Sequence, residues 1–318
     1  MKIFKNLSLL FLLIFFQQGY SQSNSQDSIF SESEITINKY IDGTLTLPNA
    51  TQKSDLVILI QGSGPVDRNG NANMMKNDAS KKIAHGLAEK GIASYRFDKR
   101  IFKMQQLQIQ EKDLKFQDFV TDVDSILSYF KQKNEFKKII IAGHSEGSLI
   151  GILATQQEGA DAFISLAGAG RSIDSIVVEQ ISKQSPELAN NARESFDEIK
   201  ATGTSTNYNP LLVSIFRPSV QPFIGSWMQY DPAQEISKLK IPVLIINGSF
   251  DIQVDETDAN RLHQANPDSK LVILDKMNHI FRKIDGDALE NTKAYNQPEL
   301  PLHPELIPTL VDFIDTIK

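Results

Sequence analysis

Short runs of apolar, often β-branched residues alternate with longer amphipathic segments along most of this chain. The later runs are mostly continuous, which is typical of strands buried on both faces of a parallel sheet. Segments of helical periodicity lie between them, and the alternation predicts a doubly wound α/β sheet. The eight expected strands are 34–40, 43–47, 56–60, 92–96, 138–142, 162–166, 241–246 and 270–274. The expected helices around them are 79–90, 116–133, 146–157, 255–265 and 304–317.

Two stretches depart from this alternation. The first two strands alternate polar and apolar residues, and Asp42-Gly43 between them predicts a β-hairpin turn. Residues 171–232 contain no clear strand, but they include predicted helices over 174–183 and 187–200. We expect this second stretch to form a helical cap over the carboxyl edge of the sheet, within a single domain over 34–318. Its apolar end includes Phe216, Phe223, Trp227 and Met228.

The first 21 residues have the pattern of a secretory signal peptide. Two lysines precede an almost wholly apolar run over 7–16, and polar and small residues follow as far as Ser21. The run is shorter than the roughly 20 residues of a membrane-spanning helix, although an uncleaved anchor is the alternative. We expect cleavage after Ser21, a flexible leader over 22–33, and a periplasmic or extracellular protein without stable membrane association.

Composition excludes several kinds of site. The chain has no cysteine, so it has no disulfide, thiolate metal site, cysteine nucleophile or lipid-modified cysteine. Its formal net charge is −6, which makes nucleic acid an unexpected partner because phosphate binding needs clustered Lys and Arg. Neither G-x-G-x-x-G nor the P-loop pattern occurs, so a nucleotide-binding interpretation fails as well.

A candidate nucleophile lies between the fifth strand and the helix that follows it. Residues 143–147 read Gly-His-Ser-Glu-Gly, which matches G-x-S-x-G in the strand–turn–helix context that a nucleophile elbow requires. The glycines at 143 and 147 remove side chains that would collide where strand and helix approach each other. Ser145 is therefore the predicted nucleophile.

Serine needs a base, and the chain has five histidines. His279 follows the last strand after a short loop, which puts it at the carboxyl edge where open α/β sheets bind ligands. The other four are less suitable because they lie inside helical segments, before the last helix, or beside the serine and directed away from it. These four are His85, His263, His303 and His144.

The acid that orients this base should lie at the same edge. Asp251 follows strand 241–246 after a short turn, and the chain order Ser145, Asp251, His279 matches the order expected for such a site. Two competitors are less suitable. Asp255 is expected to cap the next helix, and Asp275 is only four residues before His279.

Acyl transfer also needs donors for the developing oxyanion. One should be the backbone N–H of Glu146, directly after the nucleophile, and the other should come from the loop after the third strand. That loop, 61–65, reads Gln-Gly-Ser-Gly-Pro, and its glycines allow close backbone approach. Ser63 is the preferred second donor and Gly64 the alternative.

Together these segments resemble bacterial α/β-hydrolases of the carboxylesterase and serine-aminopeptidase-like group. The matching pieces are QGSGPVDRNG at 61–70, YRFDKR at 95–100, GHSEG at 143–147, IINGSFD at 245–251 and MNH at 277–279. The resemblance implies an α/β-hydrolase fold and hydrolysis of short acyl esters without cofactor or metal. Many relatives have His where this chain has Gln61, and we expect Gln61 to hydrogen-bond the loop instead. Four charged residues are expected to form ion pairs at the pocket rim: Asp67, Arg68, Asp98 and Arg100.

Three functions follow in order of preference. The first is a serine esterase in which Ser145 attacks a small-molecule ester, His279 transfers the proton and Asp251 stabilises the imidazolium. The second is a peptidase or amidase of the same fold, although no dedicated amine pocket can be identified in the cap. The third is a non-catalytic binding protein, which would have no need of the base.

Overall fold

The computed structural model describes residues 29–49 and 52–318. Its eight strands are β1 (Phe30–Asn38), β2 (Ile41–Pro48), β3 (Leu56–Ile60), β4 (Ala93–Phe97), β5 (Ile139–His144), β6 (Ala162–Leu166), β7 (Val243–Gly248) and β8 (Lys270–Leu274). They form one sheet of order β1-β2-β4-β3-β5-β6-β7-β8. β2 is antiparallel to β1 and to β4, and every other neighbouring pair is parallel. The predicted eight-stranded, mostly parallel sheet is confirmed.

The amino-terminal edge of the sheet begins earlier than predicted. β1 starts at Phe30, so residues 30–33, expected in the flexible leader, pair with β2 instead. Thr44 and Thr46 of β2 donate hydrogen bonds to glutamates of β1, which holds this polar edge strand in register. The rest of the expected leader up to residue 28, and the expected signal peptide over 1–21, lie outside the described residues.

The hairpin turn predicted at Asp42-Gly43 is wrong. Asn38 pairs with Ile41, so the turn consists of residues 39 and 40, and the Asn38 side chain accepts a hydrogen bond from the Tyr40 N–H. Gly43 lies inside β2, where a Cβ would be 2.3 Å from the Tyr95 ring of β4. The glycine is needed for this contact between distant segments, and not for a turn.

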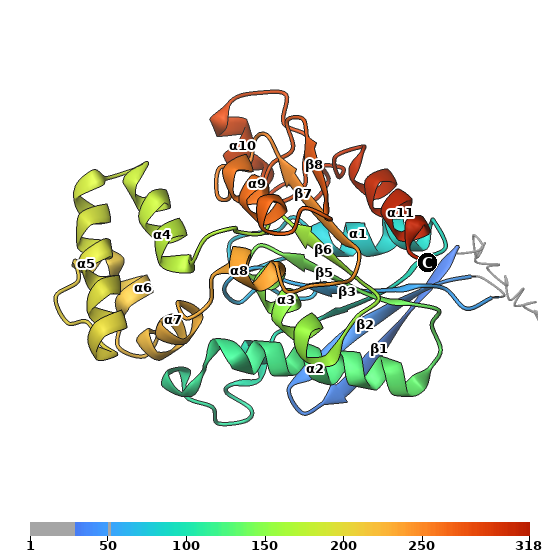
Figure 1. Cartoon of the computed structure of the whole chain (residues 1–318), viewed down its shortest axis with the longest axis horizontal. Coiled ribbons are helices and arrows are strands. Elements are labelled where there is room, and N and C mark those ends of the chain that lie inside the picture. The colour runs from blue at the N-terminus through green and yellow to red at the C-terminus, as the bar shows by residue number, and fades with distance from the viewer. Residues whose placement is uncertain (1–28, 50–51) are drawn as a thin grey trace, which may run out of the picture.

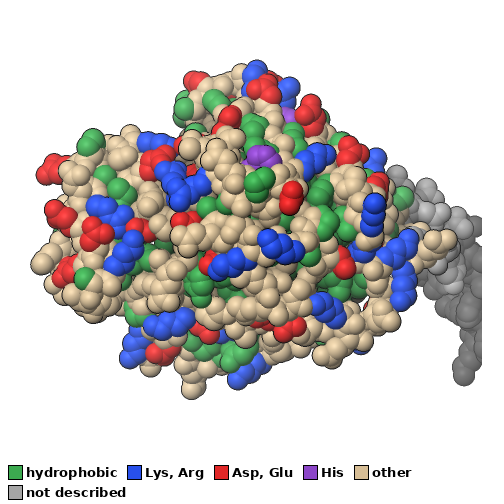
Figure 2. Space-filling view, in the orientation of Figure 1, with side chains coloured by type: hydrophobic (Ala, Val, Ile, Leu, Met, Phe, Trp, Pro, Cys, Tyr) green, Lys and Arg blue, Asp and Glu red, His purple; other side chains and the backbone are tan. Residues whose placement is uncertain are grey.

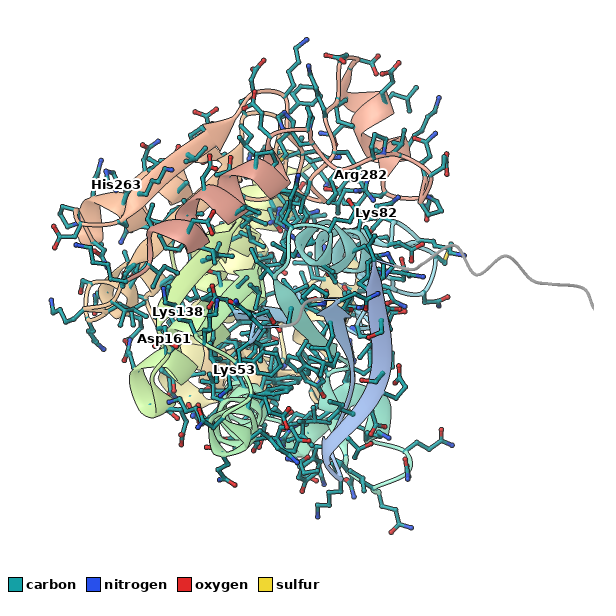
Figure 3. All side chains as sticks on the ribbon, turned by 90° about the vertical axis from the view of Figure 1, so that its right-hand side faces the viewer. Lys53, Lys82, Lys138, Asp161, His263 and Arg282 are labelled. Atoms are coloured by element: carbon teal, nitrogen blue, oxygen red, sulfur yellow. The ribbon has the colours of Figure 1, made fainter. Side chains whose placement is uncertain are left out.

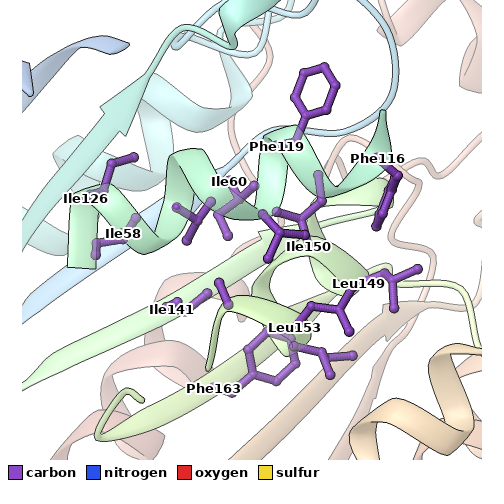
Figure 4. Packing of buried hydrophobic residues seen from close by; sticks show 14 of the residues in the cluster. Ile58, Ile60, Phe116, Phe119, Ile126, Ile141, Leu149, Ile150, Leu153 and Phe163 are labelled. Atoms are coloured by element: carbon purple, nitrogen blue, oxygen red, sulfur yellow. The ribbon is translucent and has the colours of Figure 1, made fainter. Parts of the chain in front are cut away.

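Helices cover both faces of the sheet, as Figure 1 shows. α2 (Phe116–Lys133) and α3 (Glu146–Glu158) pack on the face that receives Ile58 and Ile60 (Figure 4), and α9 (Glu256–Ala265) joins the same cluster. α1 (Ala79–Ala88) and α11 (Leu306–Thr316) cover the opposite face, which receives Val57 and Leu59. Because side chains alternate along a strand, the continuous apolar runs supply both cores.

Between β6 and β7 the chain leaves the sheet and forms helices beyond its carboxyl edge (Figure 1). We call residues 173–227 the cap. The Phe116 ring at the start of α2 stacks on Trp227 with centroids 5.2 Å apart, and the Phe116 N–H donates to Ser226. These contacts tie one side of the cap to the start of α2. The cap helices are α4 (Ile173–Ser182), α5 (Pro186–Thr202), η3 (Pro210–Leu212), α6 (Val213–Phe216) and α7 (Gln221–Trp227).

The remaining helices are short. α8 (Pro232–Ile236) leads from the cap to β7, and α10 (Ala288–Ala294), which was not predicted, lies between β8 and α11. The 3-10 turns η1 (Arg100–Lys103) and η2 (Glu111–Asp113) connect β4 to α2. None of the helices within the described residues is long and apolar enough to span a membrane. Basic and acidic side chains are interspersed over the face drawn in Figure 2.

Candidate active site

Ser145 occupies a strained turn between β5 and α3. Its backbone has φ 53° and ψ −117°, a conformation that costs a non-glycine residue about 1–3 kcal/mol. The flanking glycines make this turn possible. A Cβ at Gly143 would lie 2.1 Å from the Gly147 carbonyl oxygen, and one at Gly147 would lie 2.6 Å from that of Ile60. The G-x-S-x-G segment thus forms a sharp elbow that projects Ser145 at the carboxyl edge of the sheet.

Asp251 and His279 meet at the same edge. Asp251 follows β7, His279 follows β8, and their Oδ2 and Nδ1 atoms are 2.7 Å apart in a buried contact. The other Asp251 oxygen accepts hydrogen bonds from the N–H groups of Gln253 and Val254, at 2.8 and 3.0 Å. The carboxylate is therefore fixed from two sides. It holds the His279 proton on Nδ1 and leaves Nε2 free to act on a substrate.

The competing carboxylates have other roles. Asp255 caps α9 by accepting a hydrogen bond from the Thr257 N–H, as the sequence suggested. Asp275 accepts a long hydrogen bond of 3.4 Å from Ser249, and its main-chain carbonyl contacts His303. Neither carboxylate is hydrogen-bonded to His279 within the described part of the chain.

The loop that carries His279 is held by three residues to which the sequence interpretation gave no role. Asn278 accepts hydrogen bonds from the N–H groups of Ile280 and Arg282, which closes the turn around His279. His144 contacts the His279 carbonyl oxygen through Nε2 at 3.0 Å. Burial, followed by the neighbouring His279, lowers the pKa of His144 well below its usual range, so His144 is a neutral donor here. Arg282, labelled in Figure 3, donates a hydrogen bond to the Asn77 carbonyl oxygen. This contact ties the His279 loop to the segment just before α1.

Ser145 and His279 line one pocket of about 180 Å³. Among the described residues, the Ser145 hydroxyl has no hydrogen-bond partner. The structure therefore brings the Ser145 and His279 side chains to one cavity without a hydrogen bond between them. Catalytic hydrogen bonds are often long before substrate binds, and this arrangement is compatible with proton transfer.

The two predicted oxyanion donors also lie next to Ser145. Glu146 is the first residue of α3, and its N–H therefore has no acceptor within the helix. A Cβ placed on Gly62 would be 3.4 Å from the Ser145 Cβ, so the 61–64 loop passes directly beside Ser145. The Ser63 N–H donates a hydrogen bond to none of the described backbone carbonyl groups, so it is available to a substrate. Gly64, the alternative donor, has φ 79° and lines the same cavity wall as Ser63.

These features agree with comparisons to known proteins. The profile of the family described as serine aminopeptidase, S33, matches residues 76–282, more than half of the chain. The chain belongs to this family. The family consists of α/β-hydrolases of the serine-hydrolase type, and the predicted resemblance is confirmed.

Individual relatives are more distant. This S33 family member is 26% identical to Esterase EstD of Thermotoga maritima in an alignment of 276 residues that covers 81% of this chain and 62% of EstD. The chain thus spans less than two thirds of that curated relative. Est1E from Butyrivibrio proteoclasticus superposes with a TM-score of 0.56 at 17% identity, covering 90% of this chain and 99% of Est1E. Pyrococcus horikoshii acylaminoacyl peptidase gives a TM-score of 0.54 at 15% identity, and the match covers 91% of this chain and 42% of the peptidase. These two likenesses show the α/β-hydrolase fold.

A buried ion pair joins the two predicted oxyanion segments of this S33 family member. The Lys99 Nζ atom lies 2.9 Å from Glu146 Oε1 and 2.6 Å from the Gly62 carbonyl oxygen. The Lys99 and Glu146 side chains are only 3% and 2% exposed. The sequence interpretation missed Lys99, although it lies between Asp98 and Arg100, which were both considered. Its partners are 37 and 47 positions away in the chain, so local pattern carries no signal for the pair.

The expected rim ion pairs form only in part. Arg68 binds Asp98 through two nitrogens, which makes one ion pair within the expected set. Arg100 instead pairs with Asp122 of α2, and Asp67 accepts main-chain hydrogen bonds within its own loop. Gln61 keeps its expected role through a contact of 3.5 Å to the Arg68 carbonyl, and it also accepts from Ser80 of α1 at 2.7 Å.

A second, larger cavity opens on the other side of Ser145, beneath the cap. Its volume is about 620 Å³, and Ser63, Ser145 and Glu146 form its floor. Its walls are mainly apolar side chains of the cap, among them Ile176, Val177, Val220, Phe223 and Trp227. Among the described residues, no His, Cys, Asp and Glu side chains gather in a group of three or more that could hold a metal ion.

Proposed function

We propose that this protein hydrolyses carboxylic esters, with Ser145 as nucleophile, His279 as general base and Asp251 as the group that orients the histidine. The observation that carries this proposal is the buried 2.7 Å contact between Asp251 and His279, in a pocket whose wall includes the elbow serine. Serine is a weak nucleophile unless an adjacent base removes its proton, and a binding protein has no need of such a base.

The reaction proceeds through an acyl-enzyme. Ser145 Oγ attacks the ester carbonyl carbon while His279 Nε2 takes the hydroxyl proton, and the carbonyl oxygen becomes an oxyanion. The N–H groups of Ser63 and Glu146 donate to that oxyanion. His279 then gives its proton to the leaving alcohol oxygen, and the C–O bond breaks. Water attacks the acyl-enzyme with the same base, and the carboxylic acid and free Ser145 are released.

The charges near Ser145 favour an ester over a peptide with a free amino terminus. An aminopeptidase needs an acidic group to bind the substrate ammonium. Within the described residues that line the two cavities, Glu146 is the one acidic side chain, and Lys99 already neutralises it. The relative EstD is also named an esterase.

A peptidase or amidase is the second candidate, because the matching family is described by aminopeptidase activity. The ratio of turnover on p-nitrophenyl butyrate to turnover on an aminoacyl p-nitroanilide separates the two. We expect ester turnover to exceed anilide turnover by at least a hundredfold. A ratio near one would favour the peptidase.

The direct test combines a fluorophosphonate probe with ester assays. We expect the probe to label the wild-type protein, and both labelling and turnover of p-nitrophenyl acetate and butyrate to vanish in Ser145→Ala. A folded wild-type protein that neither reacts with the probe nor turns over ester would contradict the proposal and favour the non-catalytic binding protein.

We also propose that the protein is exported. The support is the order of charged, apolar and small residues over 1–21. Expression with its own amino terminus, followed by cell fractionation and amino-terminal sequencing, tests this. A mature chain starting near Gln22 outside the cytoplasm is expected, whereas a full-length chain in the membrane fraction would support an uncleaved anchor.

A further inference from the structure

Ser145 lies between two cavities of unequal size, and the side chains that carry out the reaction are divided between them. The larger, about 620 Å³, includes Glu146 in its wall but not His279. The smaller, about 180 Å³, includes His279 but not Glu146. Ser63 and Ser145 line both. A substrate whose carbonyl carbon is bonded to Ser145 Oγ can therefore extend one substituent into each cavity.

The position of His279 decides which substituent goes where. The histidine must hand its proton to the leaving oxygen, so the alcohol part of an ester lies on its side, in the smaller cavity. The acyl chain then extends into the larger cavity, past Glu146 and beneath the cap. The larger cavity has more than three times the volume of the smaller, so the longer substituent of the ester fits on the acyl side.

The larger cavity suits an uncharged, apolar chain. Most of its wall is aliphatic or aromatic. Its two charged residues are already paired: Glu146 with Lys99, and Arg171 with Asp258 and Glu179. No unpaired charge among these described wall residues is available for a carboxylate or an ammonium group.

We infer that the preferred substrates are esters of a medium-length apolar acid with a small alcohol, with the acyl chain beneath the cap and the alcohol beside His279. This inference rests on the proposed esterase function and deepens it. It departs from the expectation of short acyl chains, because the larger cavity accommodates a longer apolar acyl chain and the smaller cavity accommodates a small alcohol.

Two isomeric esters test the assignment. Methyl octanoate has the long chain on the acid, and heptyl acetate has it on the alcohol. We expect kcat/KM, measured by pH-stat titration, to be at least tenfold higher for methyl octanoate. Equal values, or a preference for heptyl acetate, would overturn the inference. Fluorophosphonate labelling separates this result from failure of the esterase proposal itself, because a labelled enzyme that prefers heptyl acetate is still a serine esterase.

A pair of neighbouring valines on α4 supplies matched variants. Val177 lines the larger cavity and Val178 does not, although both are half-buried. Val177→Trp should lower kcat/KM for methyl octanoate at least tenfold and leave that for methyl acetate within twofold. Val178→Trp should change neither. Unchanged methyl octanoate turnover in a folded Val177→Trp protein would place the acyl chain elsewhere.

The Lys99 ion pair carries a second, independent inference. The Gly62 carbonyl that accepts from Lys99 belongs to the same peptide group as the Ser63 N–H. A cation on a peptide oxygen draws electron density from the amide, which makes its N–H a stronger donor. The same ammonium holds Glu146, whose N–H is the other oxyanion donor. The geometry points to Lys99 as a positioning residue that aligns and polarises both donors.

The test uses substitutions that remove this cation. Lys99→Met should lower kcat by about 10- to 100-fold with KM changed less than threefold, because the donors act on the oxyanion and less on the bound ester. Affinity for a trifluoromethyl ketone, which forms a tetrahedral oxyanion on Ser145, should fall by the same factor as kcat.

A buried Glu146 left without its cation can unfold the protein, so a double variant is needed. Lys99→Met combined with Glu146→Met removes both charges and should fold while keeping the loss of kcat and of ketone affinity. A folded double variant with wild-type kcat and wild-type ketone affinity would overturn the inference.

Discussion

The carboxyl edge of the sheet and the cap meet at Ser145, but they are built differently. At the edge, buried polar groups are paired and held by main-chain contacts, as in Asp251 with His279 and Lys99 with Glu146. In the cap, apolar side chains such as Val177 and Phe223 surround a cavity of about 620 Å³. A buried polar group tolerates little displacement before its hydrogen bonds break, whereas an apolar wall accepts many shapes.

This difference suggests a division of labour. In the proposed function, the edge fixes the atoms that react, and the cap selects the acyl group by volume and hydrophobicity. Substitutions at the edge should therefore change rates or stability strongly, whereas substitutions in the cap should change preference among substrates. Each of the following predictions tests one side of that division.

The largest effect is expected at the carboxylate that orients His279. Asp251→Asn should lower kcat on p-nitrophenyl butyrate by about a thousandfold to ten-thousandfold, because the amide no longer enforces the Nδ1 tautomer. Asp255→Asn, four residues along, is the matched control and should stay within threefold, since asparagine also caps a helix. A larger loss in Asp255→Asn than in Asp251→Asn would reverse the assignment of the acid.

The same substitution at two glycines should have opposite effects on stability. Gly147→Ala places a Cβ 2.6 Å from the Ile60 carbonyl oxygen, and it should lower the free energy of unfolding by about 2–3 kcal/mol. Gly225→Ala, in α7 of the cap, meets only Ile199 at 3.5 Å and should raise it by about 0.5–1 kcal/mol. Urea unfolding measures both changes, and losses of equal size would show that the cap is packed as tightly as the edge.

The same division separates what the sequence could predict from what it could not. The parallel strands and the elbow at Ser145 follow from local patterns: continuous apolar runs, and two glycines flanking a serine at a strand end. Asp251 and His279 were predicted because each follows a strand, and parallel strands end at one edge. Gly43 was misassigned because its role depends on Tyr95, which is distant in the chain. The large cavity under the cap depends on packing among helices, to which no local pattern corresponds.

The stability of the folded protein should also depend on pH, through a carboxyl group on α2. Burial, and then the nearby Glu158, raises the pKa of Asp124 on α2 from 3.8 to about 7, and its buried Oδ1 has no hydrogen-bond partner among the residues that the structure describes. The folded protein thus keeps a proton that the unfolded chain has released. The stability from this group is complete below about pH 4, declines as pH rises from about 4 to about 7, and is constant above that.

Asp124→Asn removes this dependence. It should raise the free energy of unfolding at pH 8 by about 1 kcal/mol, well below the unscreened value because the side chain is half-buried. At pH 5 the gain should be roughly 40% of that at pH 8, and kcat should be unchanged at both pH values. Urea unfolding at the two pH values is the measurement. A changed pH profile of kcat would mean that α2 and the sheet edge are coupled.

The smallest effect is expected at the mouth of the cap. Leu211 lines the large cavity but is 76% exposed, so only part of its side chain can touch a bound acyl chain. Leu211→Ala should lower kcat/KM for methyl octanoate by about two- to fivefold, because less apolar surface of the acyl chain is then shielded from water, and leave methyl acetate unchanged. Val213→Ala is the control, because Val213 is also exposed and does not line the cavity. If Leu211→Ala slowed both esters equally, the cap would act on the chemical step itself, and the division between a reacting edge and a selecting cap would no longer hold.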